Sequence, residues 1–348
     1  MNHERINAWS RIAITGSGFD VPETRRGNDA PIFNWLKENM PAGAGALFYG
    51  YEYRRVLPWG VELVDIMAPA ASRALEDAGI EAKDVDVTIG YGSIGEFVTP
   101  NALAQVHARL GLRTDSLLLP LDHNFSGYME AIAIANALVA AGQARNCLIV
   151  FGSDWTRFVS YETRQAVSAS DGAGACVVAP TMDPKAFRYV DIASVVQSKD
   201  YGAMQMRGDV IQWHETPPWP AGTIGGIPEV AHTSPYFHLT AEGAKVFKDF
   251  GLNAPVKLIE GLLAKHDLRA EDITLITHQA SARLMDAWNE ALEPGQYLST
   301  IEKYANMTVA SVPVTFASEY DRIDRDWLVI LGLTTDIGAT ATLLRRNG

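Results

Sequence analysis

The sequence predicts an α/β protein with five layers, in the order α/β/α/β/α, made of two duplicated halves. The first observation is an internal repeat, because residues 73–89 and residues 261–277 carry the same helix, turn and strand pattern without a gap. The second is that strand-like runs alternate with helices of roughly ten or more residues, which is typical of mixed or parallel sheets covered by helices. We therefore expect one half at residues 1–181 and the other at residues 182–348.

The two halves keep the same order of elements after the repeat. Each continues with a helix, at residues 101–110 and 282–292, and then with a short strand. A buried helix follows in each half, opening near Phe125 in the first and near Asn306 in the second. Each half then closes with an apolar strand, a Gly-Ala turn and a further strand. These closing segments are residues 146–151 with 174–175, and residues 327–331 with 338–339.

The helix that opens near Phe125 has almost no polar face as far as Ala141, so we expect it to be buried on all sides. Gly142 should end it, because glycine is a common C-terminal stop. The N-terminus of a buried helix offers free N–H groups and positive potential, which suit a thiolate or an oxyanion. The residues at this helix start therefore bear directly on the chemistry.

Composition and charge argue against several classes of partner. The chain has 348 residues and a net charge of −12, which disfavours nucleic acid or an anionic membrane but is compatible with a small basic patch for an acidic carrier protein. The longest apolar run, near residues 131–141, is about half of what a bilayer-spanning helix needs. Cys147 and Cys176 each lie in an apolar strand-like run, so we expect buried thiols in a reducing, cytoplasmic compartment. No metal-ligand spacing is visible, and we expect neither a metal nor a tightly bound cofactor.

Two polar segments near the C-terminus resemble the His and Asn motifs of β-ketoacyl-acyl carrier protein synthase III (KAS III). They read Thr277-His278-Gln279-Ala280-Ser281 and Ala305-Asn306-Met307-Thr308-Val309-Ala310-Ser311-Val312-Pro313. The resemblance covers nearly the whole chain, including the opening strand at residues 14–18. The Gly-x-Gly of that strand lacks the third glycine of a dinucleotide-binding fingerprint. The resemblance implies a thiolase-like fold and a transferase that acts on acyl thioesters.

In that family a cysteine takes the acyl group from a coenzyme A thioester, and the His and Asn stabilise the oxyanion or enolate that then forms. The resemblance gives these two roles to His278 and Asn306, which can both donate to an oxygen that gains negative charge. Phe125 stands where the family's A-C-x-G-F pattern has its cysteine, and phenylalanine cannot attack a thioester. Ser126 is the adjacent candidate nucleophile, with His278 as its base. The alternative is that Ser126 is an ordinary serine in the first turn of a helix.

The resemblance also suggests positions that bind the substrate carrier. Trp35 and Arg164 match residues that hold the adenine of coenzyme A, although a second family arginine is replaced by Phe48. Arg283 matches a residue that meets the acyl carrier protein. The acyl donor should therefore arrive on coenzyme A or on the phosphopantetheine arm of a carrier protein.

A dimer is the further expectation, either a homodimer or a heterodimer with a related chain. Phe97 matches a family residue that reaches the partner's active site, and the apolar strand around Cys176 matches the family's dimer strand. Near the helix start, residues 122–124 (Asp-His-Asn) and Asp336 are unusually polar for this family and could build a new polar pocket.

Two functions remain open on these grounds. The first is an acyltransferase or condensing enzyme of a specialised biosynthetic pathway, working through Ser126 or by direct transfer between donor and acceptor beside His278 and Asn306. The second is a non-elongating partner subunit of a KAS III-like heteromer, in which Phe125 plugs the pocket. The retained His and Asn favour the enzyme, whereas the missing cysteine favours the partner subunit.

Overall fold

The computed structural model describes residues 11–40, 44–95, 97, 99–207, 223–224, 227–228 and 236–348. Ten strands form one mixed sheet, which confirms the predicted α/β class. The first five are β1 (Ile12–Asp20), β4 (Val87–Ser93), β5 (Leu117–Pro120), β6 (Cys147–Ser153) and β7 (Gly172–Pro180). The second five are β8 (Phe187–Val196), β13 (Ile273–Thr277), β14 (Gln296–Leu298), β15 (Trp327–Thr334) and β16 (Gly338–Arg346).

The strand order of the sheet is symmetric about its centre. It runs β5-β4-β6-β7-β1 and then β8-β16-β15-β13-β14, so the second set mirrors the first. In each set the strand of the repeat, β4 or β13, pairs in parallel with two neighbours, and the remaining pairs are antiparallel. Only two residue pairs between β1 and β8 join the sets. The division at residue 181 stays a prediction.

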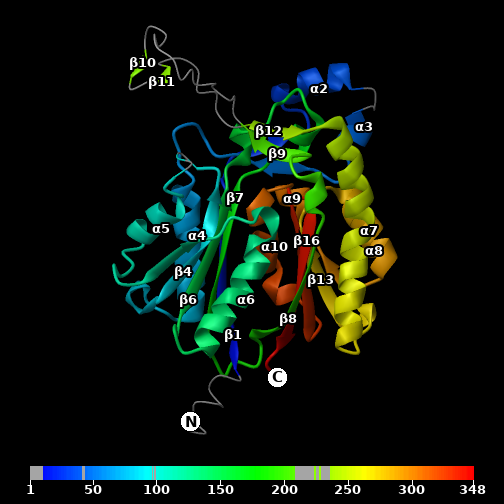
Figure 1. Ribbon diagram of the computed structural model, residues 1–348. Helices are drawn as coiled ribbons and strands as arrows, with labels where there is room; N and C mark the ends of the chain where they lie inside the picture. The colour runs from blue at the N-terminus through cyan, green and yellow to red at the C-terminus, as the bar shows by residue number, and fades with distance from the viewer. Residues whose placement is uncertain are drawn as a thin grey trace.

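Helices form three layers around the two sets of strands (Figure 1). On one outer face lie α4 (Val64–Ala78) and α5 (Leu103–Arg109), and on the other lie α7 (Ala241–Lys265) and α8 (Ala282–Leu292). Between the two sets lie α6 (Gly127–Ala140) and α10 (Ser311–Glu319), which pack on inward-facing residues of both. The predicted five-layer arrangement is therefore confirmed.

Shorter elements flank the end of the molecule that carries the candidate site. They are β2 (Arg25–Gly27), β3 (Tyr53–Arg55), β9 (Met204–Arg207), β10 (Thr223–Ile224), β11 (Ile227–Pro228), β12 (Tyr236–Leu239), α2 (Asn34–Asn39), α3 (Ala44–Leu47) and α9 (Ile301–Tyr304). No helix in the described part of the chain is both long and apolar enough to cross a bilayer.

The Gly-x-Gly of the opening strand serves the packing of α4 on β1. A Cβ atom at Gly16 would lie 2.4 Å from the backbone nitrogen of Ala78, and one at Gly18 would lie 2.5 Å from the carbonyl oxygen of Ala70. Glycine is needed where two backbones approach this closely. The structure thus gives these glycines a packing role.

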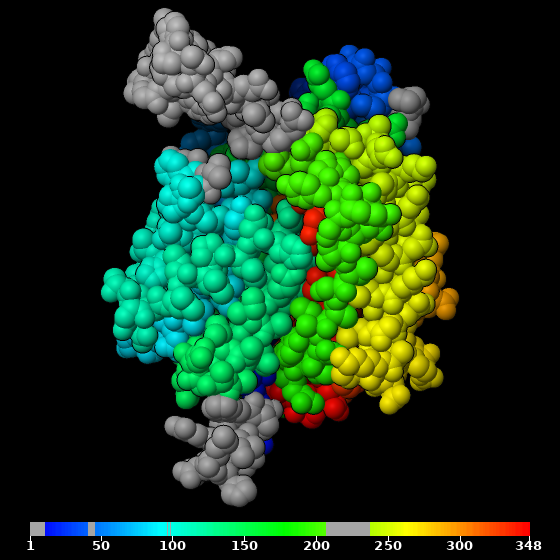
Figure 2. All heavy atoms as spheres, viewed as in Figure 1, coloured from blue at the N-terminus to red at the C-terminus, as the bar shows by residue number. Residues whose placement is uncertain are grey.

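The start and the burial of α6 differ in part from the prediction. Phe125 lies in a 3₁₀ turn (Asn124–Ser126) that precedes the α-helix, and Gly142 ends the helix with a positive φ of 70°. One face of α6 is fully buried, but Ala137 on the opposite face is exposed and its neighbours are half-buried. Figure 2 shows this helix at the molecular surface. The expectation that α6 is buried on all sides is therefore wrong, because one of its faces lies at the molecular surface.

The expectation that the strand around Cys176 is the dimer strand is also wrong. This strand, β7, is hydrogen-bonded to β1 on one side and to β6 on the other, so it has no free edge for a partner. The free edges of the ten-stranded sheet are β5 and β14. Cys147 and Cys176 are both free and fully buried, as predicted, and burial raises the pKa of each thiol to about 12.

Candidate active site

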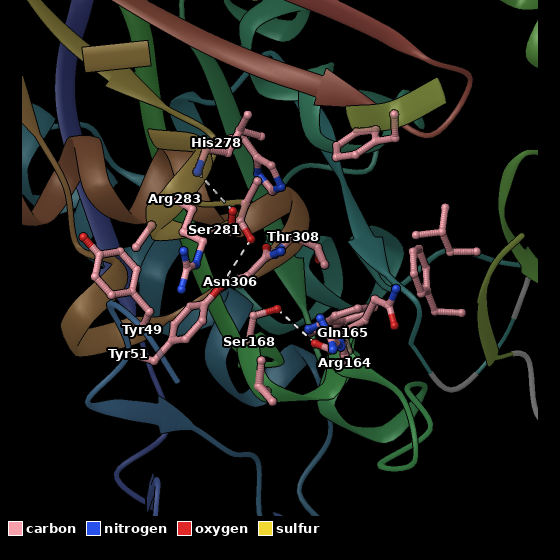
Figure 3. Close-up of a pocket in the computed structure, with 18 of the residues that line it drawn as sticks. Tyr49, Tyr51, Arg164, Gln165, Ser168, His278, Ser281, Arg283, Asn306 and Thr308 are labelled. Atoms are coloured by element: carbon pink, nitrogen blue, oxygen red, sulfur yellow. Dashed lines mark hydrogen bonds between the residues drawn. The ribbon is translucent and has the colours of Figure 1, made fainter. Parts of the chain in front are cut away.

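A cavity of about 440 Å³ lies at the N-terminal ends of α6 and α10 (Figure 3). Its lining includes His278, Asn306 and Thr308, together with two arginines, Arg164 and Arg283. Among the described residues that line it there is no carboxylate. The other lining residues are Ala46, Leu47, Tyr49, Tyr51, Phe125, Trp155, Gln165, Val167, Ser168, Met204, Phe237, Leu239, Phe247, Ala280, Ser281, Ala282 and Leu284.

His278 is held rigidly in the loop that follows β13. Its backbone N–H donates to the carbonyl oxygen of Leu331 at 2.8 Å, and its own carbonyl accepts from the N–H of Ala280 at 2.8 Å. The side chain is 2% exposed, and its Nδ1 atom has no hydrogen-bond partner. Burial lowers the pKa of His278 to about 3, so the imidazole is neutral near pH 7. A neutral imidazole can donate one hydrogen bond to a substrate oxygen but is a poor proton acceptor at this pKa.

Asn306 is oriented so that its amide donors are free. Its backbone N–H donates to Ser168 at 2.8 Å, which fixes the loop before α10. The Oδ1 atom accepts from the N–H of Thr308 at 2.8 Å and from the Ser311 hydroxyl at 3.4 Å. Because the oxygen is occupied in this way, the amide NH₂ group is available for a ligand in the cavity.

Phe125 stacks on His278 at the base of the cavity. The two rings are 4.5 Å apart between centroids, with an angle of 4° between their planes. Asn124, the preceding residue, has a φ of +48°, a left-handed conformation that asparagine adopts more readily than most residues. The turn also packs against Gly332 in β15, where a Cβ atom would lie 2.3 Å from the carbonyl oxygen of Phe125. The backbone at position 125 is thus fixed from both sides.

Ser126 does not occupy the position of a nucleophile. Its side chain is fully buried and does not line the cavity that contains His278 and Asn306. Its hydroxyl donates to the carbonyl oxygen of Leu333 at 3.3 Å. The proposed base, His278, is also too weak a base to activate a serine. The structure therefore favours the alternative, in which Ser126 is an ordinary residue in the turn before α6.

Phe125 also lines a second cavity of about 300 Å³. It shares Phe125, Trp155, Phe237 and Thr308 with the first cavity, and the rings of Trp155 and Phe237 meet edge to face at 5.3 Å. The residues that line only the second cavity are Tyr91, Ser93, Ile94, Asp122, Asn124, Met206 and Thr335. The sequence suggested that residues 122–124 and Asp336 could build a new polar pocket. Asp122 and Asn124 do line this cavity, whereas His123 and Asp336 do not.

The residues expected to bind the substrate carrier are only partly brought together. Arg164 lines the first cavity, and Arg283 lies at its rim with its guanidinium 5.0 Å from the ring centre of Tyr49. Trp35 is 40% exposed on α2 and does not line the cavity, so its role stays a prediction. Phe97 is 53% exposed, and its contact with a partner subunit likewise stays a prediction.

The polar residues at the start of α6 form an ion-pair cluster with the β15–β16 turn. His123 Nδ1 lies 2.5 Å from Glu130 Oε1, and its Nε2 lies 3.4 Å from Asp336 Oδ2. The hydrogen bond to Glu130 is the main reason that the pKa of His123 is raised, to about 9. Glu130 was not singled out in the sequence, because its partners are brought together only by the fold. No group of residues suited to a metal is present in the described part of the chain.

Comparison with known proteins points to the same family in both parts of the chain. Residues 121–197 match the model for 3-oxoacyl-[acyl-carrier-protein (ACP)] synthase III, another name for KAS III, and residues 263–344 match the model for its C-terminal part. The β-ketoacyl-[acyl-carrier-protein] synthase III of Rhodospirillum rubrum is 29% identical over 303 residues, which is 85% of each chain. That of Neisseria gonorrhoeae is 26% identical over 308 residues, or 86% of this chain and 88% of the relative.

The chain is thus similar to KAS III over most of its length. KAS III enzymes are condensing enzymes and acyltransferases that act on acyl thioesters. Solved structures agree on the fold. The 3-oxoacyl-[acyl-carrier-protein] synthase III of Aquifex aeolicus has a TM-score of 0.78 at 20% identity, covering 96% of this chain and 99% of the other. Xanthomonas campestris OleA has a TM-score of 0.79 at 15% identity, covering 96% and 97%. The KAS III-like chain therefore has the thiolase-like fold that the sequence predicted.

Proposed function

We propose that this KAS III-like chain transfers an acyl group directly from a thioester to an acceptor, without an acyl-enzyme intermediate. The donor would be carried by coenzyme A or by the phosphopantetheine arm of an acyl carrier protein. The observation that carries the proposal is the stack of Phe125 on His278, because an inert ring stands at the helix start while the neighbouring donor groups are intact.

His278 and Asn306 are suited to stabilise the oxyanion of such a transfer. Both are neutral at pH 7, both line the same cavity, and each has a polar group without a partner in the described protein. When the acceptor attacks, negative charge grows on the thioester oxygen, and fixed donors in a buried site stabilise it strongly. The bond from the acceptor to the carbonyl carbon then forms as the carbon–sulfur bond breaks, and the thiol leaves on the carrier arm. Holding both substrates in place supplies the remaining advantage.

The charge of the first cavity supports a carrier with phosphate groups. Arg164 and Arg283 line it, and none of its described lining residues is a carboxylate, so the cavity attracts anions. Related chains are named for acyl carrier protein substrates, and a structural neighbour is named as the priming β-ketosynthase of a polyketide biosynthetic pathway. We extend this to a role in a specialised biosynthetic pathway, performed by a homodimer or by a heterodimer with a related chain.

A second candidate function is a non-elongating partner subunit. The observation that favours it is again Phe125, whose ring contacts His278 and lies in the walls of both cavities. In this case Phe125 blocks the pocket, and His278 and Asn306 have no substrate to polarise.

One experiment separates these functions. The purified protein is incubated with a panel of acyl thioesters and candidate acceptors, and both intact-protein mass and thiol release are followed. Direct transfer predicts thiol release that depends on the acceptor, with no mass added to the protein. A stable acyl adduct on the protein would refute the non-covalent mechanism. Absence of any turnover across the panel would favour the partner subunit.

A further inference from the structure

We propose that the second cavity is the acceptor site, and that the acceptor is a small amine bound as its ammonium ion by Asp122. This proposal rests on the proposed function, because direct transfer requires that both substrates be bound at once. The second cavity provides a place for the acceptor next to the first cavity, with which it shares Phe125, Trp155, Phe237 and Thr308. Its volume of about 300 Å³ limits the bound part of the acceptor to a small group.

The side chains that line the second cavity are of the kinds that bind cations. Four aromatic side chains line it, Tyr91, Phe125, Trp155 and Phe237. The faces of aromatic rings attract an ammonium group even at a site open to solvent, and Asp122 is exposed here. A cavity that combines such rings with a carboxylate is therefore selective for cationic amines over neutral molecules of the same shape.

Asp122 supplies the carboxylate and has no cationic partner. It accepts from the N–H of Asn124 at 3.3 Å, which is a neutral donor. Burial and the charge of Asp122 raise the pKa of Tyr91 to about 12, so the phenol beside Asp122 is also neutral. Within the described residues no lysine or arginine pairs with it. It is also the one acidic or basic residue among the described residues that line the second cavity. Its negative charge is thus available to a ligand.

The neighbouring histidine does not cancel this charge. His123 is adjacent in sequence, but its two ring nitrogens face Glu130 and Asp336. A protonated His123 between two carboxylates leaves the group with a net negative charge, which adds to the attraction for a cation. The first cavity has the opposite character, because its described lining includes Arg164 and Arg283 and no carboxylate. The two cavities that meet at Phe125 therefore suit an anionic donor and a cationic acceptor.

The chemistry that follows is the aminolysis of a thioester. The bound ammonium gives one proton to the carboxylate of Asp122, and the freed nitrogen lone pair attacks the carbonyl carbon. The carbon–nitrogen bond forms and the carbon–sulfur bond breaks. A second nitrogen proton goes to the leaving thiolate, and Asp122 releases its proton to water. The products are an amide and a free thiol.

The test measures binding alone, so that its result does not depend on turnover. Benzylamine is titrated into the full chain at pH 7 and followed by calorimetry, without any thioester. Benzyl alcohol is the neutral control of the same shape. Asp122→Asn removes the charge and keeps the size of the side chain, and Asp249→Asn on the exposed surface of α7 is the matched control variant. Circular dichroism confirms that each variant is folded.

We expect benzylamine to bind the parent and Asp249→Asn equally, and Asp122→Asn at least about tenfold more weakly. Benzyl alcohol should bind weakly to all three. The proposal is overturned if the parent fails to bind benzylamine at millimolar concentration, if Asp122→Asn binds it as tightly as the parent, or if the alcohol binds as tightly as the amine. Amine binding without any acyl transfer would instead leave the site assigned and reject the enzymatic function.

Discussion

Replacing Phe125 by cysteine should create a reactive thiol at a site where the parent has none. The turn that holds position 125 is fixed by Asn124 and Gly332, so the new side chain should point toward His278 as the ring of Phe125 does. It would lie at the N-terminal end of α6, where the helix dipole stabilises a negative charge by about 1 kcal/mol. The thiol pKa should therefore fall below its usual value.

The size of the effect can be worked out from this environment. A stabilisation of about 1 kcal/mol lowers a thiol pKa of about 8.5 to about 7.8, which raises the thiolate fraction at pH 7 from about 3% to about 14%. Alkylation by iodoacetamide should then be about fourfold faster than for an unperturbed thiol. Because Phe125 is half-buried, losing its ring should cost about 2 kcal/mol of unfolding free energy, below the cost for a fully buried phenylalanine.

The native cysteines should give little iodoacetamide labelling in this assay. Cys147 and Cys176 are fully buried, and burial raises the pKa of both thiols, so the parent should not react. Intact-protein mass after iodoacetamide treatment should show one adduct on Phe125→Cys, and a peptide map should place it at position 125. The pH dependence of the rate gives the thiol pKa. A pKa above 8.5, or equal labelling of parent and variant, would refute the described geometry of this turn.

Three further predictions concern the neighbouring residues. His278→Ala and Asn306→Ala should each lower kcat for acyl transfer by about a hundredfold, or about 3 kcal/mol, and unchanged rates in a thiol-release assay would contradict the oxyanion role. Ser126→Ala should leave that rate unchanged and lower the unfolding free energy in urea by about 1 kcal/mol, through loss of the bond to Leu333; a severe loss of rate would instead restore the serine as nucleophile. The folded pKa of His278, about 3, lies below its unfolded value near 6.5, so its contribution to stability is full above pH 6.5 and is lost as the pH falls toward 3. Between pH 7 and pH 5 the parent should therefore lose about 2 kcal/mol more than His278→Asn in urea unfolding, and equal losses would contradict the burial of a neutral imidazole.

The fold was predictable because its signals are local and occur twice. The repeated helix, turn and strand appear as α4 with β4 and as α7 with β13, and α8 begins and ends at the predicted residues. The error at β7 has a physical cause. A strand that is apolar on both faces is typical of the centre of a covered sheet, and its composition does not reveal whether its edges are free.

The candidate site was predictable only in its residue types. His278 and Asn306 lie in short motifs that can be recognised in the sequence. The ring stack of Phe125 on His278 joins residues more than 150 positions apart, and it depends on how the two sets of strands pack. The second cavity also depends on how the chain packs, since Tyr91, Asp122 and Phe237 come from separate segments that meet only in the folded chain. The exposed face of α6 also follows from this packing.

The close contact at Gly332 bears on how this protein could change by mutation. Because the backbone of Phe125 is held against a glycine in β15, the side chain at this position can be exchanged while its direction is preserved. Phenylalanine and cysteine codons differ by a single base, so a thiol at this turn is one nucleotide substitution away. In a protein whose turn did not already hold this side chain in the same direction, introducing a thiol at this place would require several coordinated mutations. A single substitution at position 125 thus separates non-covalent from covalent acyl transfer in this protein. A library randomised at codon 125 alone is sufficient to explore both mechanisms.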